Sequence, residues 1–438
     1  MARRPRPPLN VYLNGRIVGQ VHRSSSGAID FRYDQSWLDW SRAIPVSLSL
    51  PLREDRYIGA PVLAVFENLL PDNPDVRRRV AARSDAAGSD AYSLLAAIGR
   101  DCVGALQYIP EGEEATPTSQ IVAREVSDEE IAAIIGDLAQ SPLGLGDDHE
   151  FRISLAGAQE KTALLRIGEQ WHVPHGTTPT THIIKPEIGV LKNGIDLSLS
   201  VENEYLCLKI VAALGLPATN AEMANFAGRK ALVVERFDRR WTKDNRLLRV
   251  PQEDCCQALS VPPNIKYEAD GGPGIEKIAE LLKGSDTPEK DRDIFFKAQM
   301  VFWLLGATDG HAKNFSLRLA PGRSFHLAPL YDVLSAQPNV DAKQIAKNRM
   351  KVAMAVGTTR HYAVDTIAGR HFAQTAARCS FPAKNLARLI DELQGTTASA
   401  IEQTTTKLPG NFPAALAESI ADGAKTRLRV LKLIDDAT

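Results

Sequence analysis

The sequence has few cysteines, and none of them stands in a metal-binding pattern. The five cysteines among 438 residues are an odd number, and no pair has C-x-x-C or zinc-ligand spacing. The adjacent Cys255 and Cys256 could form a disulfide bond only with strain. The sequence therefore predicts a protein of a reducing compartment, without a disulfide framework.

Long hydrophobic runs are also absent. The longest run, Met300 to Leu305, is far shorter than the roughly 20 residues that a membrane-spanning helix needs. Residues 1–5 are basic, but no apolar run follows them, so they do not resemble a signal peptide. We expect a cytoplasmic protein without a membrane partner.

The chain has no overall excess of either charge. It carries 52 Lys and Arg against 53 Asp and Glu, a net charge of -1, so bulk charge indicates neither a nucleic-acid nor a membrane partner. Local excesses do exist. Residues 341–438 contain 14 basic and 9 acidic residues, and Arg77, Arg78, Arg79 and Arg83 form a second basic cluster. These segments are interpreted as solvated helix faces, or as contacts with nucleic acid or an acidic partner.

The pattern of the first third predicts strands around a helical zone. Asn14-Gly15 is a strong hairpin turn pair between two apolar runs. A helical zone from Pro61 to Ile98 is broken at residues 68–72. The expected strands are 10–13, 17–18, 31–33, 46–50 and 104–109.

The rest of the chain changes from strands to helices. Residues 111–120 are polar and interrupted by proline, as in a linker. Strands are expected at 162–167, 181–185 and 231–237, with one helix that begins at Ser200 as N-cap and stops at Gly215. From Gln252 the pattern is mainly helical, apart from a short β segment at 315–330. These shifts predict three domains, at 1–111, 112–238 and 239–438, with a ligand held between lobes of unequal secondary structure.

The segment from Leu304 to Asp332 carries the clearest chemistry. An amphipathic helix ends at Gly306, a polar loop follows, and a hairpin precedes Asp332. Phosphoryl transfer from ATP needs a carboxylate at the attacking hydroxyl and oxygen ligands for Mg²⁺. Asp309 and Asn314 have the five-residue interval that protein kinases use. A D-x-x-x-x-N pattern alone is common, and an aspartate after a turn is often a cap, so the combination carries the prediction.

Two further segments could contact the phosphates of ATP. Ala156, Gly157 and Ala158 form a loop of small residues before a strand, so backbone N–H groups there could approach phosphate oxygens, with Lys161 adding a charge. A Walker A motif is absent, and a tight turn in a hairpin is the more frequent explanation of such a loop taken alone. Lys185 ends an apolar strand, as a phosphate-binding lysine does in kinases; the alternative is a solvated strand end.

Two weaker features complete the predicted nucleotide site. Glu204 or Glu202, on the helix after Lys185, could pair with that lysine. The strand end Val233 to Phe237 could present backbone groups to adenine, although an ordinary buried strand end fits as well.

These residues, in this order, resemble the HipA family of serine/threonine kinase toxins. The resemblance spans nearly the whole chain and rests on long motifs. The motifs are Asn68–Asp72, Ile98–Asp101, Ser154–Lys161, His182–Lys185, Val234–Arg239, Gln252–Asp254, Lys266–Glu268, Gly306–Asn314 and Tyr331–Asp332. The fold implied is α+β: a bilobal protein-kinase-like fold with an added N-terminal β-rich domain and a mainly helical C-terminal lobe.

The resemblance implies a role for each matched residue. Asp309 is expected to be the catalytic base, Asn314 and Asp332 the Mg²⁺ ligands, and Ser154 the autophosphorylation site. The expected ATP-binding residues are Leu155, Ala156, Gly157, Ala158, Gln159, Glu160, Lys161, Lys185, Glu235, Phe237, His311 and Tyr331. The motifs depart from those of typical kinases, because Ala-Thr precedes Asp309 where His-Arg is usual, and Tyr-Asp-Val stands in place of Asp-Phe-Gly.

The resemblance also implies partners and cofactors. They are ATP, Mg²⁺, a HipB-like helix-turn-helix antitoxin, operator DNA through the antitoxin complex, and an aminoacyl-tRNA synthetase as substrate, whose phosphorylation would arrest translation. A phosphoryl group on Ser154 would place about -1.5 to -2 charges beside the phosphate loop and switch the kinase off. The competing interpretations are a P-loop-like ATPase, a pseudokinase that acts as a transcriptional co-repressor with the antitoxin, and a kinase of lipids or small molecules.

Overall fold

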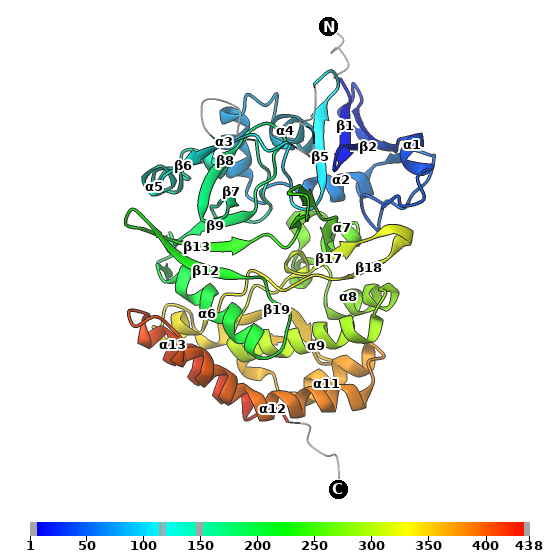
Figure 1. Ribbon diagram of the computed structural model, residues 1–438. Coiled ribbons are helices and arrows are strands. Elements are labelled where there is room, and N and C mark those ends of the chain that lie inside the picture. The colour runs from blue at the N-terminus through cyan, green and yellow to red at the C-terminus, as the bar shows by residue number, and fades with distance from the viewer. Residues whose placement is uncertain (1–6, 114–116, 118–119, 146–151, 433–438) are drawn as a thin grey trace. The chain divides into compact units, whose positions relative to one another are not determined.

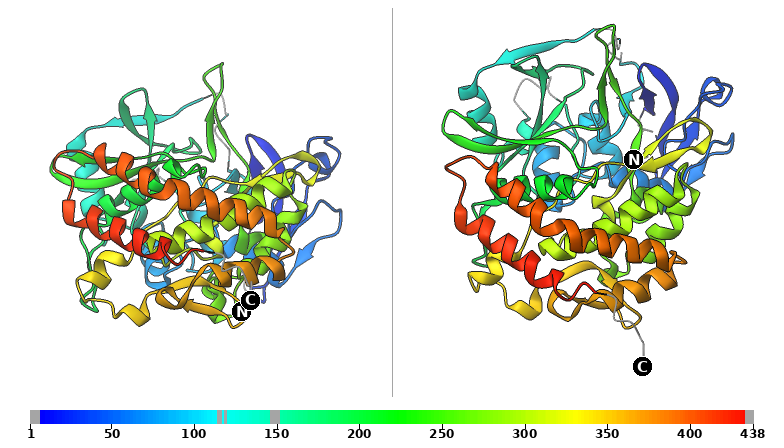
Figure 2. Two further views of the ribbon diagram at one scale, coloured as in Figure 1. Left: turned by 90° about the horizontal axis from the view of Figure 1, so that it is seen from below. Right: turned by 60° about the horizontal axis from the view of Figure 1, so that its bottom comes forward.

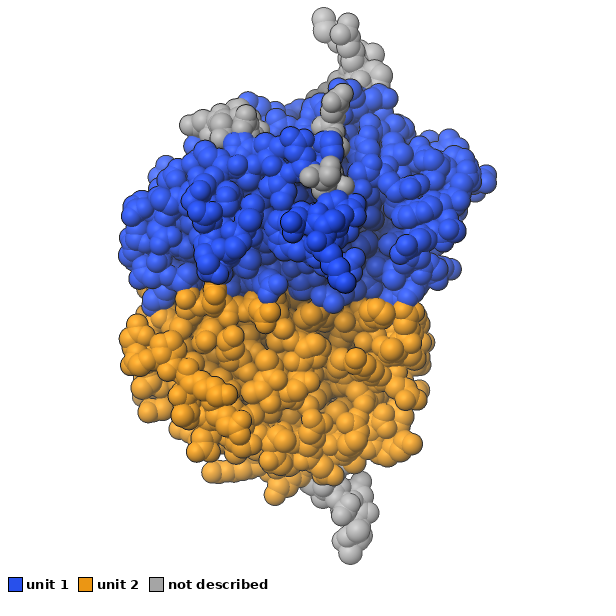
Figure 3. Space-filling model, viewed as in Figure 1, with its two compact units in different colours: residues 1–186, 224–264, 317–325 blue, residues 187–223, 265–316, 326–438 orange. Residues whose placement is uncertain are grey.

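The computed structural model describes residues 7–113, 117, 120–145 and 152–432 (Figure 1). The basic residues 1–5, parts of the predicted linker 111–120 and residue 151 before the phosphate loop lie outside the described residues. The chain packs into two compact units (Figure 3). Unit 1 contains 1–186, 224–264 and 317–325, and unit 2 contains 187–223, 265–316 and 326–438. The predicted division into three domains stays a prediction.

Unit 1 begins with a five-stranded antiparallel sheet in the order β4-β3-β2-β1-β5. The predicted hairpin turn is confirmed, since Asn14 and Gly15 both have positive φ, +47° and +83°, as a tight hairpin turn requires. The strands are β1 (Leu9–Leu13), β2 (Arg16–Arg23), β3 (Ile29–Tyr33), β4 (Tyr57–Ile58) and β5 (Leu106–Pro110).

The expected strand at 46–50 is wrong. Several of its backbone groups are bound by side chains, and Leu50 N donates within the segment to Ser47 O at 3.0 Å, as in a turn. The Tyr33 hydroxyl accepts from Val46 N at 2.9 Å and donates to Leu50 O at 2.5 Å. The Glu253 carboxylate accepts from Leu48 N at 2.8 Å. Alternation of apolar residues reports burial on one side, and it cannot tell which groups satisfy the backbone.

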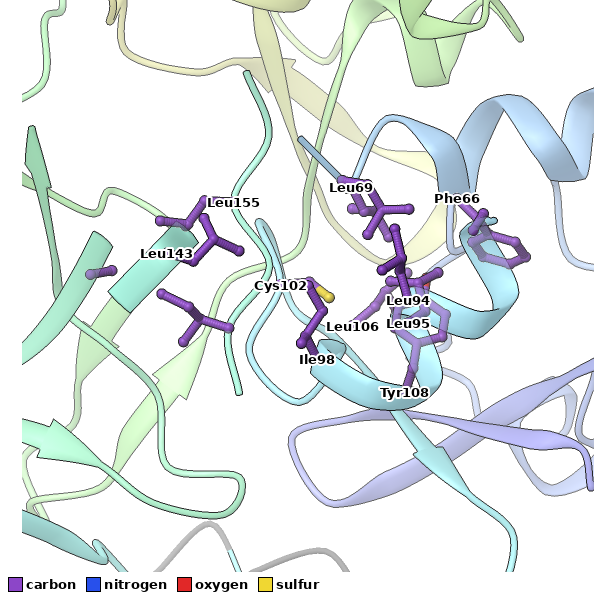
Figure 4. Packing of buried hydrophobic residues seen from close by; sticks show 14 of the residues in the cluster. Phe66, Leu69, Leu94, Leu95, Ile98, Cys102, Leu106, Tyr108, Leu143 and Leu155 are labelled. Carbon is purple, nitrogen blue, oxygen red and sulfur yellow. The ribbon is translucent and has the colours of Figure 1, made fainter. Parts of the chain in front are cut away.

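The predicted helical zone is confirmed, with its break at residues 68–72. Its helices are α2 (Ala60–Glu67), α3 (Pro74–Arg83) and α4 (Ala91–Ile98), after a short α1 (Gln35–Leu38). Asn73 and Asp90 cap α3 and α4 with their side chains. The core beneath them is drawn from α2, α4, β5 and the phosphate-loop region (Figure 4). Its labelled members include Phe66, Leu94, Ile98, Tyr108, Leu143 and Leu155.

A six-stranded sheet in the order β12-β13-β9-β7-β8-β6 follows. Its strands are β6 (Ala123–Val126), β7 (Thr162–Ile167), β8 (Gln170–Pro174), β9 (His182–Pro186), β12 (Ala221–Phe226) and β13 (Arg229–Glu235). The three strands predicted here are thus confirmed. The neighbouring short elements are α5 (Asp128–Gly136), β14 (Arg239–Trp241), β15 (Leu247–Arg249), β16 (Gln252–Asp254) and α7 (Cys255–Ala258).

Unit 2 is mainly helical, as the sequence predicts. In Figures 1 and 2 the long helices α9, α12 and α13 lie side by side. The helices are α6 (Ser200–Ala213), α8 (Ile275–Leu281), α9 (Pro288–Leu305), α10 (Gln337–Asp341), α11 (Gly369–Arg378), α12 (Ala383–Thr406) and α13 (Ala414–Leu428). The β segment predicted at 315–330 forms β17 (Ser316–Leu319) and β18 (Phe325–Leu327), with the tip 317–325 in unit 1. The remaining strand pairs are β10 (Gly189–Val190) with β11 (Asp196–Leu197) and β19 (Lys351–Val356) with β20 (His361–Ala363).

The start of α6 corrects one prediction. Ser200 is the first residue of the helix and not its cap; the cap position is Leu199. The Ser200 hydroxyl accepts from the backbone N–H of Ile188 at 2.9 Å, so it serves the preceding loop. In the part of the chain that the structure describes, no helix combines the length and the apolar character needed to cross a bilayer.

Candidate functional site

The loop that carries Asp309 leaves helix α9 in a fixed direction. Gly306 ends the helix in the left-handed conformation, with φ +67°, and a side chain there would collide with Met350 at 2.2 Å. Its carbonyl accepts from Ala336 N at 2.9 Å. Ser335 Oγ donates to Leu305 O at 2.5 Å. The helix end and the chain after Asp332 therefore hold each other, both within unit 2.

The predicted base and one predicted metal ligand are brought together. Asn314 Nδ2 donates to the backbone carbonyl of Asp309 at 2.8 Å, and the same carbonyl accepts from His311 N at 2.8 Å. Asn314 is 4% exposed, whereas the Asp309 side chain is 55% exposed. The five-residue interval thus folds into a tight loop that presents one carboxylate to solvent.

The Asn314 side chain is suited to a hard metal ion. Its amide nitrogen is held by Asp309 O, so its amide oxygen is the atom that could bind a metal. An amide oxygen is a ligand that Mg²⁺ accepts. The described residues contain no group of three His, Cys, Asp or Glu that could hold a metal. A magnesium ion here would therefore take its remaining ligands from nucleotide phosphates and water, the usual arrangement for Mg²⁺ with ATP.

Asp332 occupies an unusual backbone conformation next to this loop. Its φ is +61°, a left-handed conformation that aspartate adopts more readily than most residues with a side chain. The preceding Tyr331 hydroxyl donates to Lys313 O at 2.7 Å and lies 2.6 Å from Ser316 Oγ. Tyr331 thereby joins the Asp332 turn to the loop of Asn314. Shared metal binding by Asn314 and Asp332 stays a prediction.

Tyr267 is the residue of this site that the sequence did not single out. Its hydroxyl donates to Asp309 Oδ1 at 2.5 Å. Its ring meets that of His311 edge to face, with 4.8 Å between the centroids. Tyr267 lies in the motif Lys266–Glu268, one of those on which the resemblance rests. Its contact with Asp309, 42 positions away, leaves no signal in local periodicity.

The predicted phosphate loop, residues 155–161 of unit 1, closes around Lys161. Lys161 Nζ donates to Ala156 O at 2.9 Å. Gly157 has φ +104°, and a Cβ there would lie 2.6 Å from Lys161 Nζ, so only glycine fits. Its carbonyl accepts from Asp72 N at 3.1 Å. The small residues noted in the sequence thus serve a tight turn, which is also a turn able to bring backbone N–H groups to phosphate.

Ser154 is completely buried. Its exposure is 0%, and Oγ donates to the carbonyl of Leu69 at 2.7 Å. Its N–H donates to Asp101 O at 3.0 Å. A phosphoryl group has no room in this position, so modification of Ser154 requires the segment to leave the core.

The predicted lysine and hinge residues lie on neighbouring strands of unit 1. Lys185 of β9 is buried and pairs in register with Leu232 of β13. Glu235 is the last residue of β13. The Phe237 carbonyl accepts from Arg318 Nη2 at 3.1 Å, and the guanidinium lies 5.5 Å from the Phe237 ring. Pairing of Lys185 with Glu204 or Glu202 stays a prediction, as do all the ATP contacts.

A buried ionic network holds the chain around and after Phe237. Asp101 Oδ1 accepts from Arg239 Nη2 at 2.8 Å and Arg249 Nε at 3.1 Å, and Arg236 joins Asp101 to Asp238. Burial alone would raise the pKa of Asp101, but the three guanidinium groups lower it well below its usual value. Two of the quoted motifs, Ile98–Asp101 and Val234–Arg239, therefore share a structural role.

Comparison with known proteins identifies relatives along most of the chain. The family description "HipA N-terminal domain" matches residues 9–109, and "HipA-like C-terminal domain" matches residues 153–401. The "Putative kinase Y4mE" of Sinorhizobium fredii is 34% identical over 405 residues, which cover 91% of this chain and 92% of the relative. The "Serine/threonine-protein kinase toxin HipA" of Shewanella oneidensis is 29% identical over 80% of this chain and 78% of that protein.

One solved structure matches nearly the whole fold. It is the Shewanella oneidensis complex of HipA, HipB and operator DNA, with a TM-score of 0.79 and 24% identity, covering 97% of this chain and 96% of that one. At this identity the likeness establishes the fold, and it confirms the predicted α+β class.

Proposed function

This chain belongs to the HipA family of kinase toxins, and we propose that it transfers the γ-phosphoryl group of ATP to serine or threonine of a protein. The observation that carries the proposal is the loop of unit 2, in which Asn314 folds back on Asp309 and leaves that carboxylate exposed. The retained Asp309, Asn314, Asp332 and Lys185 favour this function over a pseudokinase.

Asp309 would act as the general base. The hydroxyl oxygen of the substrate attacks the γ-phosphorus, the bond from phosphorus to the β–γ bridging oxygen breaks, and ADP leaves with the electron pair. The hydroxyl proton passes to the Asp309 carboxylate. Positioning supplies much of the acceleration in such reactions. The hydrogen bonds from Asn314 Nδ2 and from His311 N to Asp309 O hold the base in place.

The residues that we propose to bind the nucleotide come from both units. Asn314 and Asp332 would hold Mg²⁺, which neutralises charge that develops on the phosphates. Lys185 and the backbone of the Gly157 loop would contact phosphate oxygens, and Glu235 and Phe237 would lie at the adenine. His311 and Tyr331 are the other residues that we propose to contact ATP. Arg318 Nη2 donates a hydrogen bond to Phe237 O. This bond would hold the backbone of the adenine-side segment, residues 235–237, in place before ATP binds.

Ser154 would be the site of autophosphorylation and inactivation. Its burial against Leu69 O means that a phosphorylated Ser154 cannot return to its place. The phosphate loop that follows would then be displaced, and ATP binding would fail. The modification thus switches the enzyme off through sterics as well as charge.

The partners are proposed from the relatives. The Shewanella structure contains HipA with HipB and operator DNA, and we propose a HipB-like helix-turn-helix antitoxin, and operator DNA through it, for this chain. The proposed substrate is an aminoacyl-tRNA synthetase, whose phosphorylation would arrest translation.

The test is incubation of the full chain with labelled ATP and Mg²⁺, followed by mapping of phosphosites on the chain and on a cell lysate. We expect phosphoserine on Ser154 and on a lysate protein, and none with Asp309→Asn. Release of inorganic phosphate alone would indicate an ATPase. Absence of any transfer by the wild type, with antitoxin binding intact, would indicate a pseudokinase co-repressor and overturn the proposal.

A further inference from the structure

One side chain outside the predicted site touches the proposed base directly. Tyr267 Oη donates to Asp309 Oδ1 at 2.5 Å. The Asp309 side chain is more than half exposed, and His311 Nε2 lies 3.9 Å from the same carboxylate oxygen. We propose that Tyr267 is a positioning residue that sets the orientation of the Asp309 carboxylate for proton transfer. The inference rests on the proposed kinase function.

The Tyr267 ring is held from two sides. It lies edge to face against His311, with 4.8 Å between the centroids and 80° between the planes, and His311 is buried. Lys266 Nζ lies 5.5 Å from the centroid of the same ring. Because an aromatic side chain has only two rotatable bonds, these contacts fix its hydroxyl at little entropic cost.

The backbone of Tyr267 is held as firmly as its ring. Its carbonyl accepts from Gly272 N at 2.9 Å, and a Cβ on Gly272 would lie 2.1 Å from Ile265 O. The next residue, Glu268, accepts from Ala355 N at 2.6 Å. A Cβ on Gly274 would lie 2.3 Å from the Glu268 carboxyl carbon. The turn 265–274 is therefore closely packed, as a positioning element requires.

The chemistry requires a carboxylate with one direction. In the proposed reaction, the oxygen that receives the proton must face the incoming hydroxyl while the bond to phosphorus forms. A hydrogen bond from Tyr267 to Oδ1 restricts the rotation of the carboxylate, and this sets the direction in which Oδ2 faces. Loss of a hydrogen bond to a charged group changes an equilibrium by about ten- to hundredfold, and we expect that range for the change in kcat.

The test begins with Tyr267→Phe, which removes one hydroxyl and keeps the ring contact with His311. We expect kcat to fall about ten- to hundredfold, with the KM for ATP and the affinity for ATP unchanged. The control is Tyr205→Phe on α6 in the same unit, which should leave both constants unchanged. An unaltered kcat in Tyr267→Phe would overturn the proposal. So would a raised kcat, because it would show that the hydroxyl blocks the base.

A double-mutant cycle separates positioning from general support of the fold. Once Asp309→Ala has removed the carboxylate, Tyr267→Phe should cause no further loss of the residual rate. Additive losses would show that Tyr267 acts elsewhere and would overturn the proposal.

The wild type, the two single variants and the double variant also test the contact through their stability, without an activity measurement. Their urea midpoints should be non-additive if the Tyr267–Asp309 hydrogen bond exists in solution, and additive midpoints would overturn the proposal. A wild type that transfers no phosphate would overturn the kinase function and the role of Tyr267 in it. A failure confined to the cycle would leave the kinase function standing.

Discussion

Glu253 and Leu48 are 205 positions apart in the sequence, yet Leu48 N donates to Glu253 Oε1 at 2.8 Å inside unit 1. Ser47 Oγ lies 2.5 Å from the other carboxyl oxygen. Burial raises the pKa of Glu253 to about 8. A carboxyl group thus stands in the core between two segments that the sequence does not connect, and it favours its neutral form.

The raised pKa predicts a pH-dependent stability. A carboxyl group with a higher pKa in the folded state stabilises the fold fully below its unfolded pKa of about 4.5, and this contribution is lost as pH rises through about 8. Glu253→Gln keeps an acceptor for Leu48 N and does not titrate. We expect the free energy of unfolding of the variant, relative to that of the wild type, to rise by about 1 kcal/mol per pH unit between pH 5 and 8.

Urea unfolding at pH 5 and pH 8 measures this difference. Glu169→Gln is the matched control, because the Glu169 side chain is 91% exposed; it should show the pH dependence of the wild type. Parallel pH profiles for wild type and Glu253→Gln would contradict the assignment.

Asp101 compensates three buried guanidinium groups, those of Arg236, Arg239 and Arg249. Asp101→Asn would leave Arg236 and Arg239 with Asp238, and it would remove the carboxylate with which Arg249 pairs. Removal of one partner from a buried ionic network costs about 3–5 kcal/mol, and we expect the free energy of unfolding to fall by that amount. The control is Asp244→Asn, whose pair with Arg246 is exposed, with an expected loss below about 1 kcal/mol. Equal losses in chemical denaturation would refute the special role of the network.

Gly157→Ala tests the phosphate loop. The substitution places a Cβ at φ +104° and 2.6 Å from Lys161 Nζ, so the backbone is strained and the Lys161 ammonium must move. We expect weaker ATP binding, by about tenfold, in a titration calorimeter. Gly168→Ala is the matched control, since Gly168 also has positive φ, +61°, but has open space at its Cβ. Both variants should lose about 1 kcal/mol of stability, and only the first should lose affinity for ATP.

Asn314→Asp tests the bond between the loop ends. Nδ2 donates to Asp309 O, and a carboxylate in its place would repel that carbonyl while still offering oxygen to a metal. We expect kcat to fall about a hundredfold and Mg²⁺-dependent ATP binding to persist. In the control, Asn225→Asp, the side-chain oxygen accepts from Gly228 N, which a carboxylate can also do, so activity should be retained. Full activity of Asn314→Asp would show that the amide donor is dispensable.

Local sequence determined the elements and the loop chemistry of this protein. The Asn14-Gly15 turn, the end of α9 at Gly306 and the Asp309–Asn314 interval depend on neighbours within a few residues, and periodicity and turn preferences report those. The family motifs extended this to the whole chain.

Tertiary structure alone decided which distant groups meet. The Tyr33 and Glu253 side chains replaced the strand expected at 46–50, Leu69 O holds Ser154, and Tyr267 reached Asp309 across 42 positions. A hydrogen bond or a buried charge is satisfied by whatever group the fold brings within about 3 Å, however far apart in sequence the two lie. The amino-acid sequence alone does not give the distances between residues that are far apart in it.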